Sequence, residues 1–218
     1  MKKIAVVLSG CGVYDGSEIH ESVLLLLELR RAGFAVEFFA PNVPQAHVIN
    51  HLAGEPSEKE TRQVLVEAAR IARGKVRDLA TARAAEFDGI AFPGGFGAAK
   101  NLCTFAFDGA GMKVQPEVER FVREAAAAHK PLLFACISPV IAAKVLAQGV
   151  EVTLGADGPI AGVVAQWGAR HTPIAVTSCL VDRHRKVVTV PAYMYDADIV
   201  DVATGIAAGV KEFAGLIG

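Results

Sequence analysis

Short, continuous apolar runs alternate with amphipathic stretches along the chain. The runs at 4–8 and 131–135 are entirely apolar and 88–92 is apolar after Asp88 and Gly89, which is typical of strands buried on both faces of a parallel sheet. The stretches 17–31 and 116–129 carry apolar residues at helical spacing and follow or precede such runs. This alternation predicts an α/β fold: a three-layer sandwich around a mainly parallel central sheet, of the flavodoxin-like type. Because such sheets form sites at the carboxyl ends of their strands, we expect the loops after Leu8, Phe92 and Ala135 to meet in one crevice.

The remaining pattern fits the same architecture within a single domain spanning 1–218. The further elements expected are strands at 36–39, near Val152, at 174–178 and at 187–190, a hairpin turn at 182–185, and helices from Pro139 to about Gln148 and from about Asp196 to Leu216. The segment 41–74 is long for a connection between strands. Its Ser57-Glu58-Lys59-Glu60 motif looks like a capping box ahead of an apolar stripe that begins at Val64. We therefore predict a helical insertion there that covers the side of the crevice.

Composition narrows the class of protein. The 218 residues are 52% hydrophobic and 21% charged with a net charge of −1, so the chain shows no electrostatic footprint for nucleic acid or an anionic membrane. The apolar run Ile4 to Leu8 is shorter than the ~7 to 15 residues of a secretory signal, and no stretch approaches the ~20 residues of a membrane span. We expect a cytoplasmic enzyme.

The cysteines and histidines give no sign of a disulfide framework or a metal site. The four cysteines are widely spaced, without a C-x-x-C pair or zinc-type spacing, and the six histidines are scattered. The loop Gly10-Cys11-Gly12-Val13-Tyr14-Asp15 also fails the dinucleotide fingerprint, because an aspartate replaces the third glycine. We expect no metal and no cofactor.

One cysteine stands where an apolar run changes into a helical pattern. Cys136 follows Ala135, and Pro139 suits the first turn of a helix. A thiol at a helix N-terminus can have its pKa lowered from about 8.5 into the range of about 3.5 to 7.5, which favours the nucleophilic thiolate. Cys136 is therefore the candidate nucleophile, and the alternative is a small buried residue that fills a tight turn.

Two further groups could act with this thiol. In the loop Pro93-Gly94-Gly95-Phe96-Gly97, the amide of Gly95 could form an oxyanion hole with the amide of Ile137, unless the glycines serve packing only. Glu21 lies beside a mostly apolar helix face and points either to solvent or into the crevice. In the crevice, burial would raise its pKa and let it share a proton with Cys136.

Two other residues are weaker candidates. His171 lies downstream of Cys136, as the histidine partner of a catalytic thiol often does. Lys100 could bind an anionic substrate or lower the pKa of the thiol, or it could be an ordinary solvated lysine.

Together these motifs resemble the PfpI/ThiJ superfamily of class I glutamine amidotransferase-like domains, and within it the ElbB family of isoprenoid-biosynthesis-associated glyoxalases. The stretches that carry the resemblance are 8–21, 48–52, 67–71, 93–102 and 191–194. The resemblance implies Cys136 as nucleophile, Glu21 as acid, and Gly95 and Ile137 as oxyanion donors. Protease-like members have a histidine directly after the cysteine, where this chain has Ile137, and no His-x-Glu motif of glutaminases is present. Peptidase and glutaminase activities are therefore disfavoured.

The resemblance implies a glutathione-independent, glyoxalase-like lyase that converts glyoxal or methylglyoxal to glycolate or lactate through a cysteine hemithioacetal. An apparent deglycase activity could arise from the same chemistry, and the superfamily leads us to expect a homodimer. The alternative is a non-catalytic redox-sensing or stress-response protein that uses the same reactive cysteine, Cys136.

Overall fold

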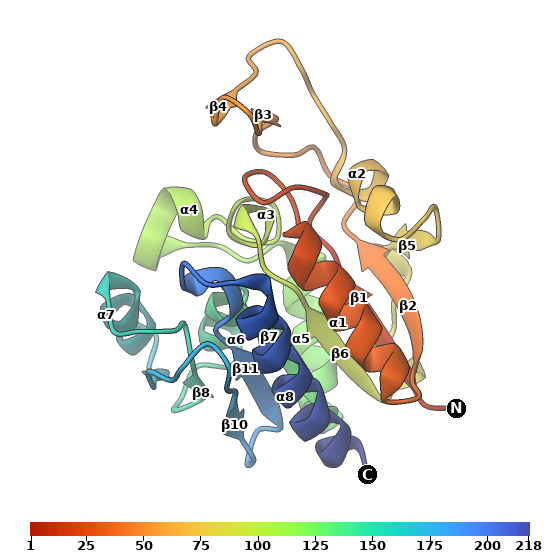
Figure 1. The fold of residues 1–218 in the computed structure, drawn as a ribbon, viewed down its shortest axis with the longest axis vertical. Helices are drawn as coiled ribbons and strands as arrows, with labels where there is room; N and C mark the ends of the chain where they lie inside the picture. Colours follow the sequence, from red (N-terminus) through yellow and green to blue (C-terminus); the bar gives the residue numbers. More distant parts are fainter.

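A seven-stranded sheet forms the centre of the protein, as seen in a computed structural model that describes residues 1–218 (Figure 1). Its strand order is β10-β11-β7-β6-β1-β2-β5. The strands are β1 (Lys3–Val7), β2 (Ala35–Ala40), β5 (Val76–Asp78), β6 (Gly89–Phe92), β7 (Leu132–Ala135), β10 (Leu180–Asp182) and β11 (Val187–Val190). All neighbouring strands are parallel except the edge pair β10–β11. The predicted α/β fold with a mainly parallel sheet is confirmed.

Helices cover both faces of the sheet, which makes the three layers. On one face lie α1 (Ile19–Arg31) and α8 (Ile199–Ile217), side by side in front of the sheet in Figure 1. On the other face lie α5 (Pro116–Ala127) and α6 (Pro139–Leu146). The strands β1, β6 and β7 are buried almost completely because each face packs against a helical layer, which explains their unbroken apolar sequences. None of the helices is long and apolar enough to cross a bilayer.

The segment 41–74 is only partly helical, so the prediction of a helical cover was wrong for its first half. It begins with a small antiparallel hairpin, β3 (Ile49–Asn50) and β4 (Glu55–Pro56), which projects from the body of the protein, and ends in α2 (Val64–Ile71) (Figure 1). The predicted capping box does not form. The N–H of Ser57 donates to Val48 O at 2.7 Å and so extends the hairpin, while Gln63 precedes the helix without a side-chain cap.

The C-terminal third differs from prediction in one strand. Residues 174–178 are irregular, because Pro173 has no N–H to donate and the carbonyl of Ile174 accepts from the Tyr195 hydroxyl at 2.8 Å. The pairing partner of β8 (Glu151–Val152) is instead β9 (Arg170–His171). Three short helices were not predicted: α3 (Phe96–Lys100), α4 (Phe105–Asp108) and α7 (Pro159–Gln166). All three lie at the carboxyl end of the sheet, where they surround the crevice.

Candidate active site

Cys136 lies at the apex of the turn between β7 and α6. Its φ is 60°, a left-handed conformation that is unusual for a residue with a side chain. Its N–H donates to Val190 O at 2.9 Å, which fixes the turn to the neighbouring strand. The buried Ser138 hydroxyl accepts from the Ala135 N–H at 3.0 Å and donates to Phe92 O at 3.0 Å. Such bonds hold the strained turn and place the thiol at the strand end.

The glycines of the loop after β6 allow this turn to approach closely. A Cβ atom at Gly94 would lie 2.3 Å from the Cβ of Cys136 and 2.7 Å from Glu21 Oε2. Gly95 has a φ of 92°, and a Cβ there would lie 2.4 Å from the backbone nitrogen of Glu18. Neither position accepts a side chain without displacement of the backbone. The N–H groups of Gly95 and Ile137 lie close enough to the sulfur of Cys136 to act against a rise in its pKa.

Glu21 is completely buried and faces the thiol, not the solvent. Its Oε2 accepts from the Gly94 N–H at 2.8 Å, and its Oε1 accepts from the Tyr193 N–H at 3.3 Å. Its own N–H donates at 2.6 Å to Oε2 of Glu18, the residue that caps the N-terminus of α1. These bonds join α1, the loop after β6 and the segment after β11 around one carboxyl group.

Burial dominates the electrostatics of the pair. Removal from water, and next the nearby Glu18 carboxylate, raise the pKa of Glu21 to about 7. Burial and the Glu21 carboxylate raise the pKa of Cys136 above its usual value, against the N–H groups of Gly95 and Ile137. The prediction that the helix N-terminus lowers the pKa of this thiol was therefore wrong, because burial and the neighbouring carboxylate outweigh the two N–H donors.

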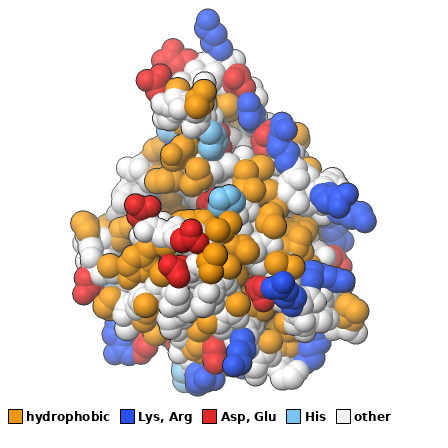
Figure 2. Space-filling view, in the orientation of Figure 1, with side chains coloured by type: hydrophobic (Ala, Val, Ile, Leu, Met, Phe, Trp, Pro, Cys, Tyr) orange, Lys and Arg blue, Asp and Glu red, His pale blue; other side chains and the backbone are white.

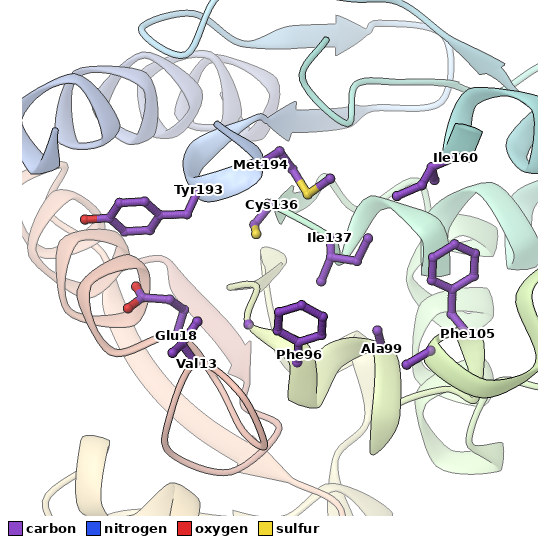
Figure 3. Close-up of a pocket in the computed structure, with 12 residues that line it drawn as sticks. Val13, Glu18, Phe96, Ala99, Phe105, Cys136, Ile137, Ile160, Tyr193 and Met194 are labelled. Carbon is purple, nitrogen blue, oxygen red and sulfur yellow. The ribbon is translucent and has the colours of Figure 1, made fainter. Parts of the chain in front are cut away.

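The thiol opens into a cavity of about 330 Å³ (Figure 3). Its walls are Val13, Glu18, Gly95, Phe96, Ala99, Phe105, Ala106, Cys136, Ile137, Ile160, Tyr193 and Met194. The loops that follow β1, β6 and β7 therefore meet in one crevice, as the sequence predicted. In the space-filling view, hydrophobic side chains gather around this region of the face and acidic side chains lie among them (Figure 2).

Two of the predicted residues lie elsewhere. His171 does not line the cavity; its Nδ1 accepts from the Leu154 N–H at 3.2 Å, and its buried Nε2 has no hydrogen-bond partner. The Lys100 ammonium donates to Tyr14 O at 2.9 Å and lies over the ring of Phe96, and Lys100 does not line the cavity. No three His, Cys, Asp or Glu side chains come together as potential metal ligands.

Sequence reasoning missed two residues that border the thiol. Glu18 lines the cavity and caps α1, a role that its place just before the helical pattern indicates. Tyr193 contributes both its N–H to Glu21 and its side chain to the cavity wall, and its hydroxyl lies 2.9 Å from His20 Nδ1. The stretch 191–194 marked this position in the sequence, but only the fold brings it to Glu21.

The sheet, with a cysteine elbow, a buried glutamate on the first helix and a glycine loop at one edge, has the class I glutamine amidotransferase-like fold, which a DJ-1 superfamily protein from Salmonella typhimurium shares at 20% identity and a TM-score of 0.57. Curated relatives place the chain more narrowly. It is 52% identical over 99% of its length to "ES1 protein homolog, mitochondrial" of Rattus norvegicus and covers 84% of that protein. It is 51% identical over 99% of its length to "Glutamine amidotransferase-like class 1 domain-containing protein 3, mitochondrial" of Homo sapiens, again covering 84%. The chain belongs to this family of ES1 homologues.

Solved structures agree with this assignment. The chain is similar to an isoprenoid biosynthesis protein with an amidotransferase-like domain from Ehrlichia chaffeensis, at 36% identity and a TM-score of 0.94 over the whole of both chains. A glyoxalase III from Candida albicans shares the fold, with a TM-score of 0.62, 13% identity and 96% of each chain covered. No family model matches the sequence.

The relatives correct one expectation. Both curated relatives are named mitochondrial, and this overturns the cytoplasmic location expected from the composition and from the short apolar run Ile4 to Leu8. Amphipathic, arginine-rich targeting segments lack the long apolar run on which that expectation relied.

Proposed function

We propose that the protein is a cofactor-independent, glyoxalase-like lyase that converts glyoxal or methylglyoxal to glycolate or lactate. One observation carries the proposal: the buried Glu21 carboxyl, with its pKa raised to about 7, lies beside the Cys136 thiol at the wall of a cavity. A group with a pKa near 7 can accept and return a proton at neutral pH, which is what general acid–base catalysis requires.

The first step is addition of the thiol to the aldehyde. Glu21 accepts the proton of Cys136 as the sulfur bonds to the aldehyde carbon, and the aldehyde oxygen gains a negative charge. We assign the N–H groups of Gly95 and Ile137, which lie beside the sulfur, as the donors that stabilise that oxygen. Protonation of the oxygen gives a hemithioacetal.

The second stage is an internal redox reaction. Glu21 removes the proton from the carbon that bears sulfur and an enediol forms; a proton then returns to the adjacent carbon. The former aldehyde carbon is oxidised to a thioester while the former ketone carbon is reduced to an alcohol, so no external oxidant or reductant is needed. Water hydrolyses the thioester, releases the hydroxy acid and restores the Cys136 thiol. The balance is R–CO–CHO + H₂O → R–CHOH–COOH.

We also propose that the protein is a member of the ElbB family. The motifs that resemble the ElbB family, and the name of the similar protein from Ehrlichia chaffeensis, both support a connection with isoprenoid biosynthesis. An apparent deglycase activity would follow if dicarbonyls released from adducts were consumed.

We also propose that the protein forms a homodimer. Ile19, Val23 and Leu27 are exposed and lie four residues apart along one side of α1, where a second copy would cover them. Light scattering coupled to gel filtration tests this assembly, and a monomer at micromolar concentration would exclude it.

The alternative of a redox sensor is less well supported. Oxidation of a cysteine follows its thiolate character and its exposure. Cys136 is 7% exposed, and its pKa is raised by burial and by Glu21. The same pair is better suited to proton-coupled addition than to reaction with peroxide. Incubation with glyoxal and methylglyoxal, with the products identified for the wild type and Cys136→Ser, separates the two functions. An enzyme forms hydroxy acid, whereas a sensor forms no more than the variant.

A further inference from the structure

The cavity beside Cys136 is larger and more apolar than glyoxal requires. Ten of its twelve lining residues are hydrophobic, and its volume of about 330 Å³ reaches the range of about 300 to 1,000 Å³ of small-molecule sites. Glyoxal has only two carbon atoms. A two-carbon substrate would leave most of the apolar wall without a partner.

The apolar wall lies on one side of the thiol. Phe96, Ile137, Phe105 and Ile160 line the cavity on the side of Cys136 that faces away from Glu18 (Figure 3). These four residues form the apolar arm of the cavity. They come from α3, from the turn before α6, from α4 and from α7, so four separate segments converge on this space. An aldehyde carbon at the sulfur would direct its substituent into the apolar arm.

The charged residues around the cavity limit the charge that the substituent can carry. No lysine or arginine lines this cavity, and the Glu18 carboxylate forms part of its wall. The adjoining depression, which shares Val13, Glu18, Tyr193 and Met194 with the cavity, adds His20 and Asp196. The Lys100 ammonium donates to Tyr14 O and does not line the cavity. An anionic substituent in the cavity would lose its hydration and lie beside the Glu18 carboxylate with no lysine or arginine to pair with it.

We propose that the site selects uncharged 2-oxoaldehydes with a branched or aromatic apolar substituent over glyoxal, and excludes aldehydes that carry a carboxylate. The selection rests on the proposed glyoxalase function and narrows its substrate class. Burial of a substituent the size of a valine or phenylalanine side chain corresponds to a gain of about 10- to 100-fold in kcat/KM. Phenylglyoxal should therefore be turned over with a kcat/KM about 10- to 100-fold higher than that of glyoxal.

Alkylation of Cys136 tests the selectivity without relying on turnover. Rates with iodoacetanilide, iodoacetamide and iodoacetate are measured by peptide mass spectrometry, each divided by the rate with free N-acetylcysteine. The expected order is anilide, then amide, then acetate, with about 10-fold between neighbours. Ile160→Lys, which places a cation in the apolar arm, should reduce the anilide rate and raise the acetate rate. Ala165→Lys is the matched control, because Ala165 is exposed on the same helix and does not line the cavity.

The outcomes separate the two proposals. Equal normalised rates with all three reagents, or a kcat/KM for glyoxal above that for phenylglyoxal, would overturn the substrate class and leave the glyoxalase function in place. The expected alkylation order without turnover of any dicarbonyl would overturn the glyoxalase function and support the selectivity of the cavity alone. The expected order together with faster turnover of phenylglyoxal supports both.

Discussion

The N–H of Gly94 donates a hydrogen bond of 2.8 Å to Oε2 of Glu21, and this bond holds the carboxyl group of α1 against the turn that carries the thiol. The missing side chain of Gly94 makes the contact possible, because a Cβ atom would collide with both Cys136 and Glu21. The loop after β6 thus positions an acid that lies far away in sequence. The distance between the acid and the thiol depends on a glycine that takes part in no chemistry.

The thiol should titrate at lower pH when its acidic neighbour is neutralised. The Glu21 carboxylate is, after burial, the main cause of the raised pKa of Cys136. In Glu21→Gln the N–H groups of Gly95 and Ile137 remain while the negative charge is lost, so we expect the pKa of Cys136 to fall. The ultraviolet absorbance of the thiolate across pH, with Cys136→Ser subtracted as a control, measures this change. An unchanged titration would show that the two groups are not coupled.

The stability of the protein should depend on pH through Glu21. Its pKa is raised from 4.5 to about 7, so the native state binds more protons than the unfolded state between these values. The free energy of unfolding therefore falls as pH rises through this window, by about 3 kcal/mol in total. In Glu21→Gln this contribution is absent.

Urea unfolding at about pH 4 and about pH 8 measures the effect. At each pH, the unfolding free energy of Glu21→Gln is subtracted from that of the wild type. We expect this difference to be about 3 kcal/mol smaller at about pH 8 than at about pH 4. In the variant, the NH₂ group of the glutamine would face the N–H of Gly94 or Tyr193 and destabilise the fold. This cost is the same at both pH values, so it cancels when the two differences are compared. A pH-independent difference would contradict the raised pKa.

Gly94→Ala should remove activity and destabilise the protein. The added methyl group would lie 2.3 Å from the Cβ of Cys136, and the overpacking should cost about 1 to 3 kcal/mol of unfolding free energy. Gly111→Ala is the matched control, since a Cβ at Gly111 meets no atom within 4 Å. Thermal unfolding and dicarbonyl turnover report the two effects. Equal behaviour of the two variants would mean that the close approach of the loop and the turn is unimportant.

The sequence predicted the strands that are buried on both faces of the sheet, because such strands have unbroken apolar sequences. The strands β1, β6 and β7 belong to this group, and the helical spacing of apolar residues predicted α1 and α5. The sequence did not predict segments whose structure depends on tertiary contacts. The hairpin β3–β4 is one, since Ile49 N–H donates to the buried Asp15 carboxylate at 2.7 Å, a contact between segments that the local pattern does not reveal. The irregular stretch around Ile174 is another, because Tyr195 determines its course.

The sequence predicted which residues form the site, but it did not predict their protonation states. Glu21, Gly95, Cys136 and Ile137 come together as expected, because strand ends and a glycine loop meet at one edge of a parallel sheet. The protonation of the thiol could not be predicted from its place at a helix N-terminus. That place supplies two N–H donors, but burial and a buried carboxylate outweigh them, and both require three-dimensional contacts.

Methylglyoxal turnover followed by proton NMR tests the central claim, that Cys136 and Glu21 form a proton-sharing catalytic pair. The wild type should form lactate, Cys136→Ser should form none above the uncatalysed rate, and Glu21→Gln should be slower by about 10²- to 10⁴-fold. Lactate formation by the wild type that does not exceed that of Cys136→Ser, or that is unaffected in a folded Glu21→Gln variant, would contradict the account.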